Sequence, residues 1–483
     1  MASASGGRAA GWKRAWRHET RAAPVRSAVA RPERSRPQES RLRYWRWSSD
    51  NRASGAEESP PYFPVRYAIT TFGCRVNQAD SLQLEMELRA RGGTRVSVDE
   101  ADLVVVNSCS VTASADQGTR QALRRVERVN PGARVVATGC YASRAPDEIG
   151  ALPGAPLVIP NDQKHTIADQ VGPVEETTAS RFGDGPGACG ASVSPGIVGR
   201  VAFMLRVQTG CDQPCSYCVI PSTRGRGRSL DAAHVLRAVG HAADSGFKEV
   251  VLTGVHLGSY GRDLEPPGGL IDLLRALDDH PSAVTYRLSS LEPMDCPPEL
   301  IDLAAASGRF APHFHLPLQH ASDTVLRLMR RPYTLEVYRR AVDRIRNLIP
   351  HAAIGSDLIA GFPGETDEDA AQTLNYVSAS PLTYLHVFPY SPRPGTEAAS
   401  LAGRVSGPLV RERARALRDL GVTLSRRFRA GLVDTVRPGL TLHGGTVVLT
   451  DNYLKVPLPS GRDGNQRVRV RITRADPLAG ELE

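Results

Sequence analysis

The sequence lacks the features that mark a membrane protein or a disulfide-rich secreted protein. It contains no run of about 18 apolar residues, so no membrane-spanning helix is expected. Its eight cysteines are too few, in a chain of 483 residues, for a disulfide scaffold, and their unequal spacing is typical of ligands. The length exceeds that of one ordinary domain and indicates roughly three domains. We therefore expect a multidomain protein in which cysteines bind metal.

A strong charge of either sign is also missing from most of the chain. The formal net charge is +9, but residues 1–58 hold 13 Lys or Arg and 6 Asp or Glu, which leaves 47 basic and 45 acidic residues for the rest. No apolar stretch in this segment resembles a signal peptide. We interpret residues 1–60 as a disordered basic extension or a start codon assigned too far upstream, with an RNA-contacting arm as the alternative. Global charge therefore says little about a partner.

Strand and helix patterns alternate over residues 63–165. Apolar strands are expected at residues 65–71, 102–106, 134–137 and 157–159. A helix with helical periodicity is expected at 78–91, with Asn77 as N-cap, and a polar helix at 114–129. This alternation predicts an α/β domain with an open parallel sheet.

Three cysteines follow three of these strands. Cys74, Cys109 and Cys140 each lie just past the carboxyl end of a predicted parallel strand, where ligands gather in open α/β sheets. Three loops can therefore converge on one point, although three buried apolar cysteines are the alternative. Cys189 falls in a Gly-, Pro- and Ser-rich linker at 166–198, and Cys296 lies outside any cluster, so both are expected to be structural.

Residues 199–430 contain a second series of strands and helices. Strands are expected at 201–208, 249–253, 284–289, 313–316, 353–358 and 384–388. Helices are expected at 232–245, 270–279, 298–307, 334–348, 368–378 and 411–429. The series predicts a partial or full TIM-like (β/α) barrel of parallel strands, with its chemistry at the carboxyl-end loops.

Residues 431–476 lose helical periodicity and read as short alternating strands, which predicts a small β-barrel. In the last strand Arg467, Arg469 and Arg471 share one face, because strand side chains alternate. Together with Lys455 they are candidates for binding an RNA backbone. The alternative is a solvated edge strand whose charge opposes aggregation.

The most specific motif is Cys211-Asp-Gln-Pro-Cys215-Ser-Tyr-Cys218, directly after the first barrel strand. A structural zinc site needs four ligands, and no fourth Cys or His is near in sequence. Soft thiolates also select iron–sulfur clusters, with one thiolate per iron as the usual arrangement. Three thiolates on a four-iron cluster leave one iron open to a reagent. The motif therefore favours an iron–sulfur cluster that binds a small molecule.

This motif at the mouth of a parallel barrel resembles the signature of radical S-adenosylmethionine enzymes, and the three N-terminal cysteines resemble the second cluster site of methylthiotransferases. Over about residues 65–475 the chain is similar to the branch that acts on threonylcarbamoyladenosine in tRNA, with a C-terminal domain similar to the TRAM RNA-binding domain. The similarity rests on the following stretches: Phe72-Gly-Cys-Arg-Val-Asn-Gln78, Asn107-Ser-Cys-Ser-Val-Thr112, Thr138-Gly-Cys-Tyr-Ala142, Thr253-Gly-Val-His-Leu-Gly-Ser-Tyr-Gly261, Leu288-Ser-Ser-Leu-Glu-Pro293, His315-Leu-Pro-Leu-Gln-His320 and Gly361-Phe-Pro-Gly-Glu-Thr366.

The resemblance implies two [4Fe–4S] clusters with different tasks. The cluster on Cys211, Cys215 and Cys218 would bind S-adenosylmethionine and cleave it to a 5′-deoxyadenosyl radical. The cluster on Cys74, Cys109 and Cys140 would hold the sulfur that is methylated and delivered to C2 of the modified adenosine. The resemblance also implies that S-adenosylmethionine lies against strand-end loops, with the following candidate contacts: Gly254, His256, Ser290, Glu292, Gln319, Asp357 and Gly361.

The implied partners are the anticodon stem-loop of a tRNA and an electron donor of flavodoxin or ferredoxin type, in a reducing cytoplasm and without a membrane. The sulfur donor stays open. Arg224, Arg226 and Arg228 could face phosphates or the cofactor carboxylate, or form a solvated charge run. Alternative functions are methylthiolation of isopentenyladenosine in tRNA or of a ribosomal-protein aspartate. An alternative of another class is a non-enzymatic iron–sulfur or zinc RNA-binding module.

Overall fold

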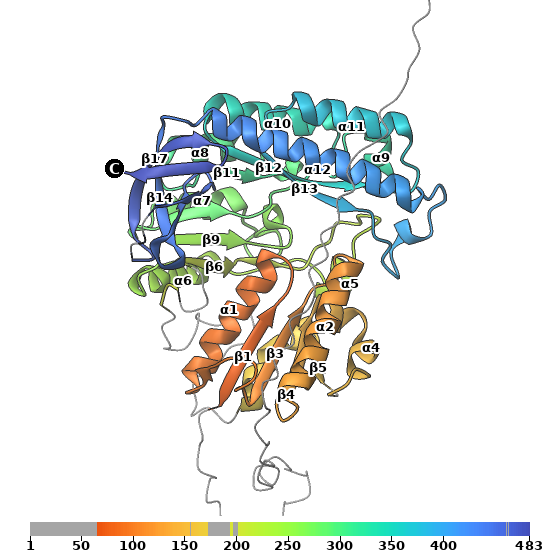
Figure 1. Ribbon diagram of the computed structural model, residues 1–483, viewed down its shortest axis with the longest axis vertical. Coiled ribbons are helices and arrows are strands. Elements are labelled where there is room, and N and C mark those ends of the chain that lie inside the picture. The colour runs from red at the N-terminus through yellow and green to blue at the C-terminus, as the bar shows by residue number, and fades with distance from the viewer. Residues whose placement is uncertain (1–64, 155, 172–193, 197–200, 460, 462) are drawn as a thin grey trace, which may run out of the picture. The chain divides into compact units, whose positions relative to one another are not determined.

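The computed structural model describes residues 65–154, 156–171, 194–196, 201–459, 461 and 463–483 (Figure 1). The predictions made for residues 1–60 and for Cys189 lie outside the described residues. No helix among the described residues is both long and apolar enough to cross a membrane.

The N-terminal part is an open, wholly parallel sheet, as predicted, with the strand order β2-β1-β3-β4-β5. Val104, Val105 and Val106 are fully buried because helices cover both faces of the sheet. The strands are β1 (Arg66–Thr71), β2 (Thr94–Arg95), β3 (Leu103–Ser108), β4 (Arg134–Gly139) and β5 (Leu157–Ile159). The helices are α1 (Arg75–Ala90), α2 (Ala113–Val129), α3 (Cys140–Arg144), α4 (Pro146–Gly150) and the 3-10 segment η2 (Asn161–Val171).

The predicted start of the first helix is wrong. Helix α1 begins at Arg75 with Cys74 at its N-cap, so Asn77 lies inside the first turn. The amide of Asn77 donates instead to the carbonyls of Phe72 and Ser108, at 2.8 and 2.9 Å. Asn77 therefore joins two strand-end loops rather than capping its own helix.

The central part is a partial barrel of six parallel strands, as predicted. Its strands are β6 (Ala202–Arg206), β9 (Glu249–Thr253), β10 (Thr285–Leu288), β11 (His313–His315), β12 (Ala353–Ala360) and β13 (Tyr384–Pro389). They form two three-stranded sheets, β6-β9-β10 and β11-β12-β13, and the isolated bridges Tyr286–Phe310 and Ser290–His315 connect the sheets. The antiparallel pair β7 (Gln208–Thr209) and β8 (Arg228–Ser229) flanks the loop that contains Cys211.

Helices cover the outer face of this barrel and enclose the largest apolar core of the described chain. In Figure 1, α10, α11 and α12 lie together beside β12 and β13. These helices are α6 (Ala232–Asp244), α7 (Leu270–Asp278), α8 (Pro298–Ala306), α9 (Asp323–Leu328), α10 (Leu335–Leu348), α11 (Asp367–Ala379) and α12 (Gly407–Ala430). Helix α5 (Ile220–Arg224) instead contacts α3 and η2 of the N-terminal part. Short 3-10 segments are η3 (Leu257–Ser259), η4 (Pro293–Asp295) and η5 (Glu397–Ala399).

The C-terminal part is an antiparallel sheet with the order β16-β15-β14-β17-β18, whose terminal strands β16 and β18 contact each other and nearly close a barrel. The elements are β14 (Val436–Leu442), η6 (His443–Gly445), β15 (Val447–Thr450), β16 (Lys455–Pro457), β17 (Arg467–Ala475) and β18 (Leu478–Leu482). Strand β18 was not predicted from the sequence. Because β17 lies between β14 and β18, the alternative of an edge strand is wrong.

Candidate functional site

The barrel trio, defined as Cys211, Cys215 and Cys218, lies on the loop between β7 and α5. Backbone N–H groups donate to two of the sulfurs, at 3.4 Å to Cys211 and 3.5 Å to Cys218. Burial raises the pKa of the Cys218 thiol to about 12. A bound metal reverses this preference, because a coordinating thiol is deprotonated outright.

An arginine supports the third sulfur of the barrel trio. Nη1 of Arg331 donates to Sγ of Cys215 at 3.2 Å, and Nη2 pairs with the carboxylate of Glu292. Nε of Arg331 donates to the hydroxyl of Tyr333 at 3.1 Å, which in turn donates to the carbonyl of Pro317 at 2.8 Å. Glu292, a predicted cofactor contact, is thus connected to the barrel trio through one buried cation.

His256, another predicted cofactor contact, also lies beside the barrel trio. Its Nδ1 is 3.8 Å from Sγ of Cys211, and its Nε2 is 2.5 Å from the carboxylate of Asp295. Its backbone N–H donates to the side chain of Gln208 at 2.9 Å. Together these contacts hold the buried imidazole in one orientation toward the sulfur.

The N-terminal trio, defined as Cys74, Cys109 and Cys140, occupies three strand-end loops of the parallel sheet. Cys74 is exposed, whereas Cys109 and Cys140 are buried. Gly73 has a φ of +91°, and a Cβ there would lie 2.6 Å from Sγ of Cys109, so only glycine permits this approach of the first two loops. Two of the three loops that were predicted to converge, those of Cys74 and Cys109, are therefore in direct contact.

Arg224, at the end of the helix that follows the barrel trio, reaches the N-terminal trio. Asn161 lies 3.7 Å from Sγ of Cys140 and also donates to the carbonyl of Thr223 at 2.9 Å. Burial opposes ionisation of Cys140, but the charges of Arg224 and Lys164 hold its pKa below the usual value. Of the three arginines singled out in the sequence, only Arg224 is placed here among the described residues, since Arg226 and Arg228 are exposed.

A buried ion cluster joins the two regions. Asp80 on α1 pairs with Lys164 at 2.7 Å, with Arg224 at 2.9 Å and with Arg206 on β6. Burial acts against ionisation of Asp80, yet the three cations hold its pKa well below the usual range. The same arginine therefore contacts both Asp80 and the surroundings of Cys140.

The donor sets fit iron–sulfur clusters better than single zinc ions. A tetrahedral zinc with Zn–S bonds of about 2.3 Å keeps its sulfur ligands about 3.8 Å apart. Within the described residues, the group of three potential ligands whose atoms all lie within 4.8 Å of one another contains no cysteine. Among the described residues, each trio is thus wider than a closed zinc site and offers three soft thiols. This arrangement suits a cluster with one open iron.

The other predicted cofactor contacts occupy different environments. Gly254 packs against Gln208, Ser290 is exposed, and Gln319 has a φ of +65°. A Cβ at Gly361 would lie 2.3 Å from a methyl group of Val410, so this glycine is required for packing against α12.

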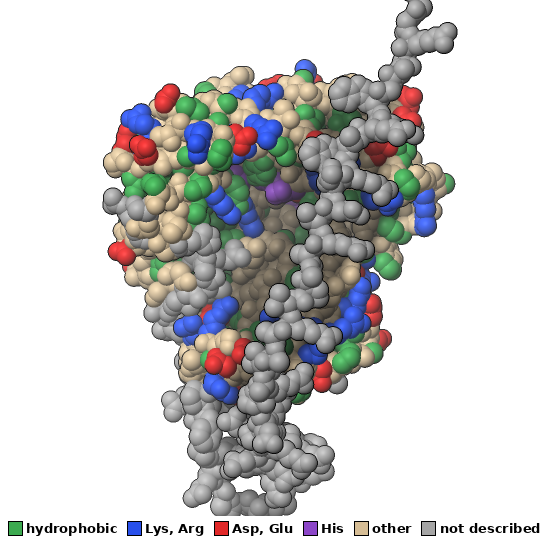
Figure 2. Space-filling view, in the orientation of Figure 1, with side chains coloured by type: hydrophobic (Ala, Val, Ile, Leu, Met, Phe, Trp, Pro, Cys, Tyr) green, Lys and Arg blue, Asp and Glu red, His purple; other side chains and the backbone are tan. Residues whose placement is uncertain are grey.

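Asp357 belongs to a group of side chains that the sequence analysis missed. Its Oδ1 lies 2.9 Å from Nε2 of His315 and 3.1 Å from Nδ1 of His386. The hydroxyl of Tyr384 lies 3.1 Å from the other nitrogen of His315 and 2.8 Å from Nε2 of His313. These residues come from β11, β12 and β13. Figure 2 shows a histidine side chain in a hollow of the molecular surface. The sequence signal for this group was the presence of polar residues at alternate positions of the strands.

The proposed basic face of the C-terminal barrel is only partly free. Arg467 donates to backbone carbonyls of the central domain. Arg469 lies 3.6 Å from the carboxylate of Glu483, which also pairs with Arg471. Lys455 is exposed on β16. The alternation of Arg and apolar side chains is confirmed. Glu483, which directly follows β18, neutralises part of the basic face.

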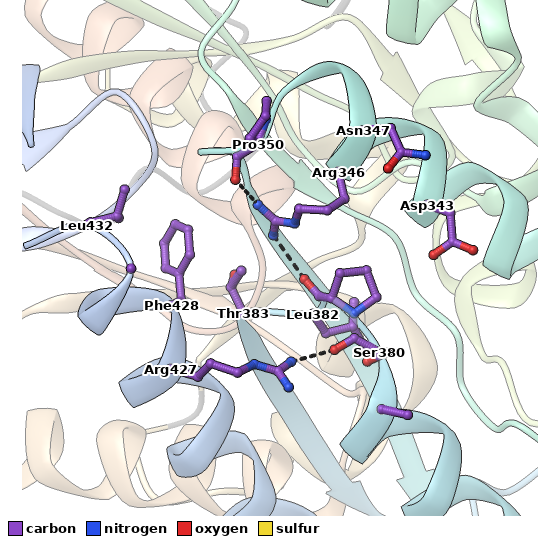
Figure 3. A pocket seen from close by; sticks show the side chains of 13 residues that line it. Asp343, Arg346, Asn347, Pro350, Ser380, Leu382, Thr383, Arg427, Phe428 and Leu432 are labelled. Atoms are coloured by element: carbon purple, nitrogen blue, oxygen red, sulfur yellow. Dashed lines mark hydrogen bonds between the residues drawn. The ribbon is translucent and has the colours of Figure 1, made fainter.

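A cavity of about 670 Å³ lies elsewhere, between α10, α12 and the start of β13 (Figure 3). Arg346 donates to the carbonyls of Pro350 and Pro381, and Arg427 donates to the carbonyl of Ser380. Its cations are thus used by the fold, and none of the six trio cysteines lines it.

Comparisons with known proteins match the N-terminal sheet and the central barrel to two different families. Residues 205–377 match the radical SAM superfamily, and residues 66–159 match an uncharacterized protein family, UPF0004. The barrel with its trio is therefore that of a radical S-adenosylmethionine enzyme.

Three curated relatives cover most of the chain. Threonylcarbamoyladenosine tRNA methylthiotransferase MtaB of Bacillus subtilis (strain 168) is 33% identical over 424 residues, which cover 84% of this chain and 94% of that protein. Its namesake in Aquifex aeolicus (strain VF5) is 35% identical over 424 residues, covering 84% and 100%. A tRNA-2-methylthio-N(6)-dimethylallyladenosine synthase of Mycobacterium bovis (strain ATCC BAA-935 / AF2122/97) is 34% identical over 398 residues, covering 79% and 77%. The chain belongs to the radical S-adenosylmethionine tRNA methylthiotransferases and is an enzyme of that kind.

Proposed function

We propose that the enzyme attaches a methylthio group to C2 of N6-threonylcarbamoyladenosine next to the anticodon of tRNA, using two [4Fe–4S] clusters. The observation that carries this proposal is the pair of cysteine trios at strand ends of two adjoining domains, with Arg224 between them. The Bacillus and Aquifex relatives carry threonylcarbamoyladenosine in their names, and their alignments span nearly their whole lengths.

The barrel trio would hold the cluster that binds S-adenosylmethionine, and the N-terminal trio would hold the cluster that supplies sulfur. With the clusters bound, one molecule of S-adenosylmethionine would supply a 5′-deoxyadenosyl radical and a second would supply the methyl group, which is chemistry of the cofactors. Arg331 hydrogen-bonds Cys215, and His256 orients toward Cys211, so both residues tune and fix the barrel trio. Arg224 places a positive charge beside Cys140, which favours the thiolate that a metal needs.

Residues around the barrel trio would also bind S-adenosylmethionine. His256 lies beside Sγ of Cys211, Glu292 is connected to Cys215 through Arg331, and Asp357 faces the interior of the same barrel. Gly254, Ser290 and Gln319 would contribute from neighbouring strand ends. The packing of Gly361 against α12 supports a structural role for that glycine instead.

The C-terminal barrel would bind the anticodon stem-loop through Lys455, Arg467, Arg469 and Arg471. Exposed arginines on a small barrel suit a phosphate backbone because the contact is electrostatic and does not depend on sequence. We propose a flavodoxin- or ferredoxin-type electron donor and a cytoplasmic location, since oxygen degrades exposed iron–sulfur clusters.

The test combines metal analysis with nucleoside analysis. Anaerobically loaded protein should contain about eight irons per chain if both trios carry a four-iron cluster, against about four for one cluster. Mass spectrometry of tRNA nucleosides from cells with and without the gene should show loss of the 2-methylthio derivative of threonylcarbamoyladenosine. Loss of the 2-methylthio derivative of isopentenyladenosine instead would reassign the substrate. This nucleoside is the second candidate because of the name of the Mycobacterium relative.

A further inference from the structure

A tyrosine of the C-terminal barrel enters the interior of the central barrel. The ring centroid of Tyr453 lies 4.3 Å from that of His313 and 6.4 Å from that of Tyr384. Its hydroxyl accepts a hydrogen bond from Nη2 of Arg75 at 3.0 Å. Arg75 directly follows Cys74 and begins helix α1. Side chains of all three domains therefore meet next to the N-terminal trio.

The environment compensates the positive charge of Arg75 only in part, because its Cζ lies over the ring of Tyr453 at 5.4 Å from the centroid. In the described part of the chain, no carboxylate lies within ion-pair distance of Arg75, and its Nη1 is buried without a hydrogen-bond partner. The neighbouring Arg287, by contrast, pairs with Glu249 at 2.7 Å. Arg75 is half-buried, and a guanidinium partly shielded from water without an anion is destabilising. Arg75 is therefore prepared for a negatively charged ligand.

The surroundings of Arg75 add to this preference. Helix α1 has no acidic residue in its first turn and no side-chain cap, so no carboxylate of the helix itself offsets the partial positive charge at its N-terminus. Asp357, whose carboxylate faces the same interior, is already bound by His315 and His386. Burial, reinforced by Arg287 and Arg75, lowers the pKa of His313, which stays neutral. An anion that reaches Arg75 thus meets little competition.

We propose that Arg75 determines specificity by binding the carboxylate of the N6-threonylcarbamoyl group, an inference that rests on the function proposed above. The planar guanidinium matches a carboxylate and can bind it through two N–H groups. In the purine ring only N1 separates C2 from C6, which carries the N6 substituent. A substrate whose C2 faces the N-terminal trio therefore directs this substituent toward the residues beside Cys74. An isopentenyl group is uncharged and leaves Arg75 unpaired.

The test compares anticodon stem-loops that differ only at N6, which carries the threonylcarbamoyl group, its carboxamide, or the isopentenyl group. Affinity for the full-length, cluster-loaded protein is measured by fluorescence anisotropy without reductant, and kcat/KM with reductant. The wild type should bind the carboxylate RNA about 10- to 100-fold more tightly than the carboxamide. Arg75→Gln should bind both equally, and Arg75→Lys should keep part of the preference. Arg128→Gln, which changes an exposed arginine on α2, should keep all of it.

The outcomes separate this inference from the proposed function. If the wild type modifies the threonylcarbamoyl RNA while Arg75→Gln keeps the wild-type affinity ratio, the role of Arg75 is overturned and the proposed function stands. A wild-type ratio near one also overturns the role of Arg75. If the wild type acts only on the isopentenyl RNA, the proposed function fails. Because the ratio compares two RNAs on one protein, a variant that loses iron still gives an answer, and iron is measured alongside.

Discussion

At the scale of single residues, the barrel trio owes its environment to a few donors. Backbone N–H groups and Nη1 of Arg331 donate to the three sulfurs, at 3.2 to 3.5 Å. Such hydrogen bonds shift the reduction potential of a cluster and fix the geometry of its ligands. The fold therefore holds the three sulfurs of the barrel trio in place. Each of these thiols can be tested separately from those of the N-terminal trio.

Replacing Cys215 with Ala should abolish formation of 5′-deoxyadenosine, because the barrel trio would lose one of its three ligands. Iron should fall from about eight to about four per chain, since the N-terminal trio is untouched. Chromatography of the reaction products and iron analysis measure both effects. Cys296→Ala is the matched control, because Cys296 is buried outside both trios. Normal cleavage by Cys215→Ala would refute the assigned role.

Replacing Cys109 with Ala should separate the two steps in the opposite way. S-adenosylmethionine cleavage should continue at a measurable rate, whereas the thiomethylated nucleoside should disappear because the N-terminal trio lacks a ligand. Mass spectrometry of the tRNA product and quantification of 5′-deoxyadenosine give the two readouts. Thiomethylated product at the wild-type yield would remove the sulfur-supplying role from Cys109.

The six trio cysteines were predicted from local patterns, because three of them each follow a strand and the other three share one C-x3-C-x2-C motif. The residues that complete the interior of the barrel could not be found in this way. Arg75 and Tyr453 are 378 positions apart in sequence, and no local periodicity encodes a contact over that distance. His315 and Asp357 were visible as polar residues in strands, but their meeting depends on the register between β11 and β12.

At the scale of elements, the long amphipathic helices and apolar strands were predictable. The strand Glu249–Thr253 was predicted with its observed bounds, because a continuous apolar run is a strong signal. The two-residue strands β7 and β8 are too short to show a period. Helix α1 starts earlier than predicted, because Asn77 bonds to neighbouring loops and Cys74 takes the N-cap position.

Strand β17 carries the element-scale prediction. Replacing Arg469 and Arg471 together with Gln should weaken tRNA binding and lower the magnitude of its salt slope by about two, because two phosphate contacts would be lost. Anisotropy titrations over a range of salt concentrations measure the slope. Glu483→Gln should strengthen binding, since Glu483 pairs with Arg471 and lies near Arg469. An unchanged affinity in both variants would remove this face from the RNA interface.

Arg467 on the same strand should behave differently. It donates to backbone carbonyls of the central domain, so Arg467→Gln should lower thermal stability as well as affinity. A melting curve of this variant beside that of Arg469→Gln separates docking of the barrel from contact with RNA. Equal melting temperatures of the two variants would contradict the docking role.

At the scale of the whole molecule, the N-terminal sheet and the central barrel are joined by the buried cluster around Asp80. Sequence patterns predicted the two domains but not this contact, because Asp80 and Arg206 are 126 positions apart. The charges of Lys164, Arg206 and Arg224 are all directed at one carboxylate. The ion cluster around Asp80 therefore links the stability of the folded protein to the position of Arg224 beside Cys140.

Asp80→Asn should destabilise the protein by about 3–5 kcal/mol, because three buried cations would remain without their anion. Asp302→Asn, which breaks an exposed pair with Arg344, should cost about 0–1 kcal/mol and serves as the control. The pKa of Asp80 lies below its usual value in the folded state, so its contribution is present above an unfolded pKa of about 3.9 and is lost as the pH falls below it. Urea unfolding of the full-length chain between about pH 3 and pH 7 should therefore show a wild-type loss near the lower end that Asp80→Asn lacks. Equal pH dependence in the two proteins would contradict the role of Asp80 as the anion that holds the two domains together.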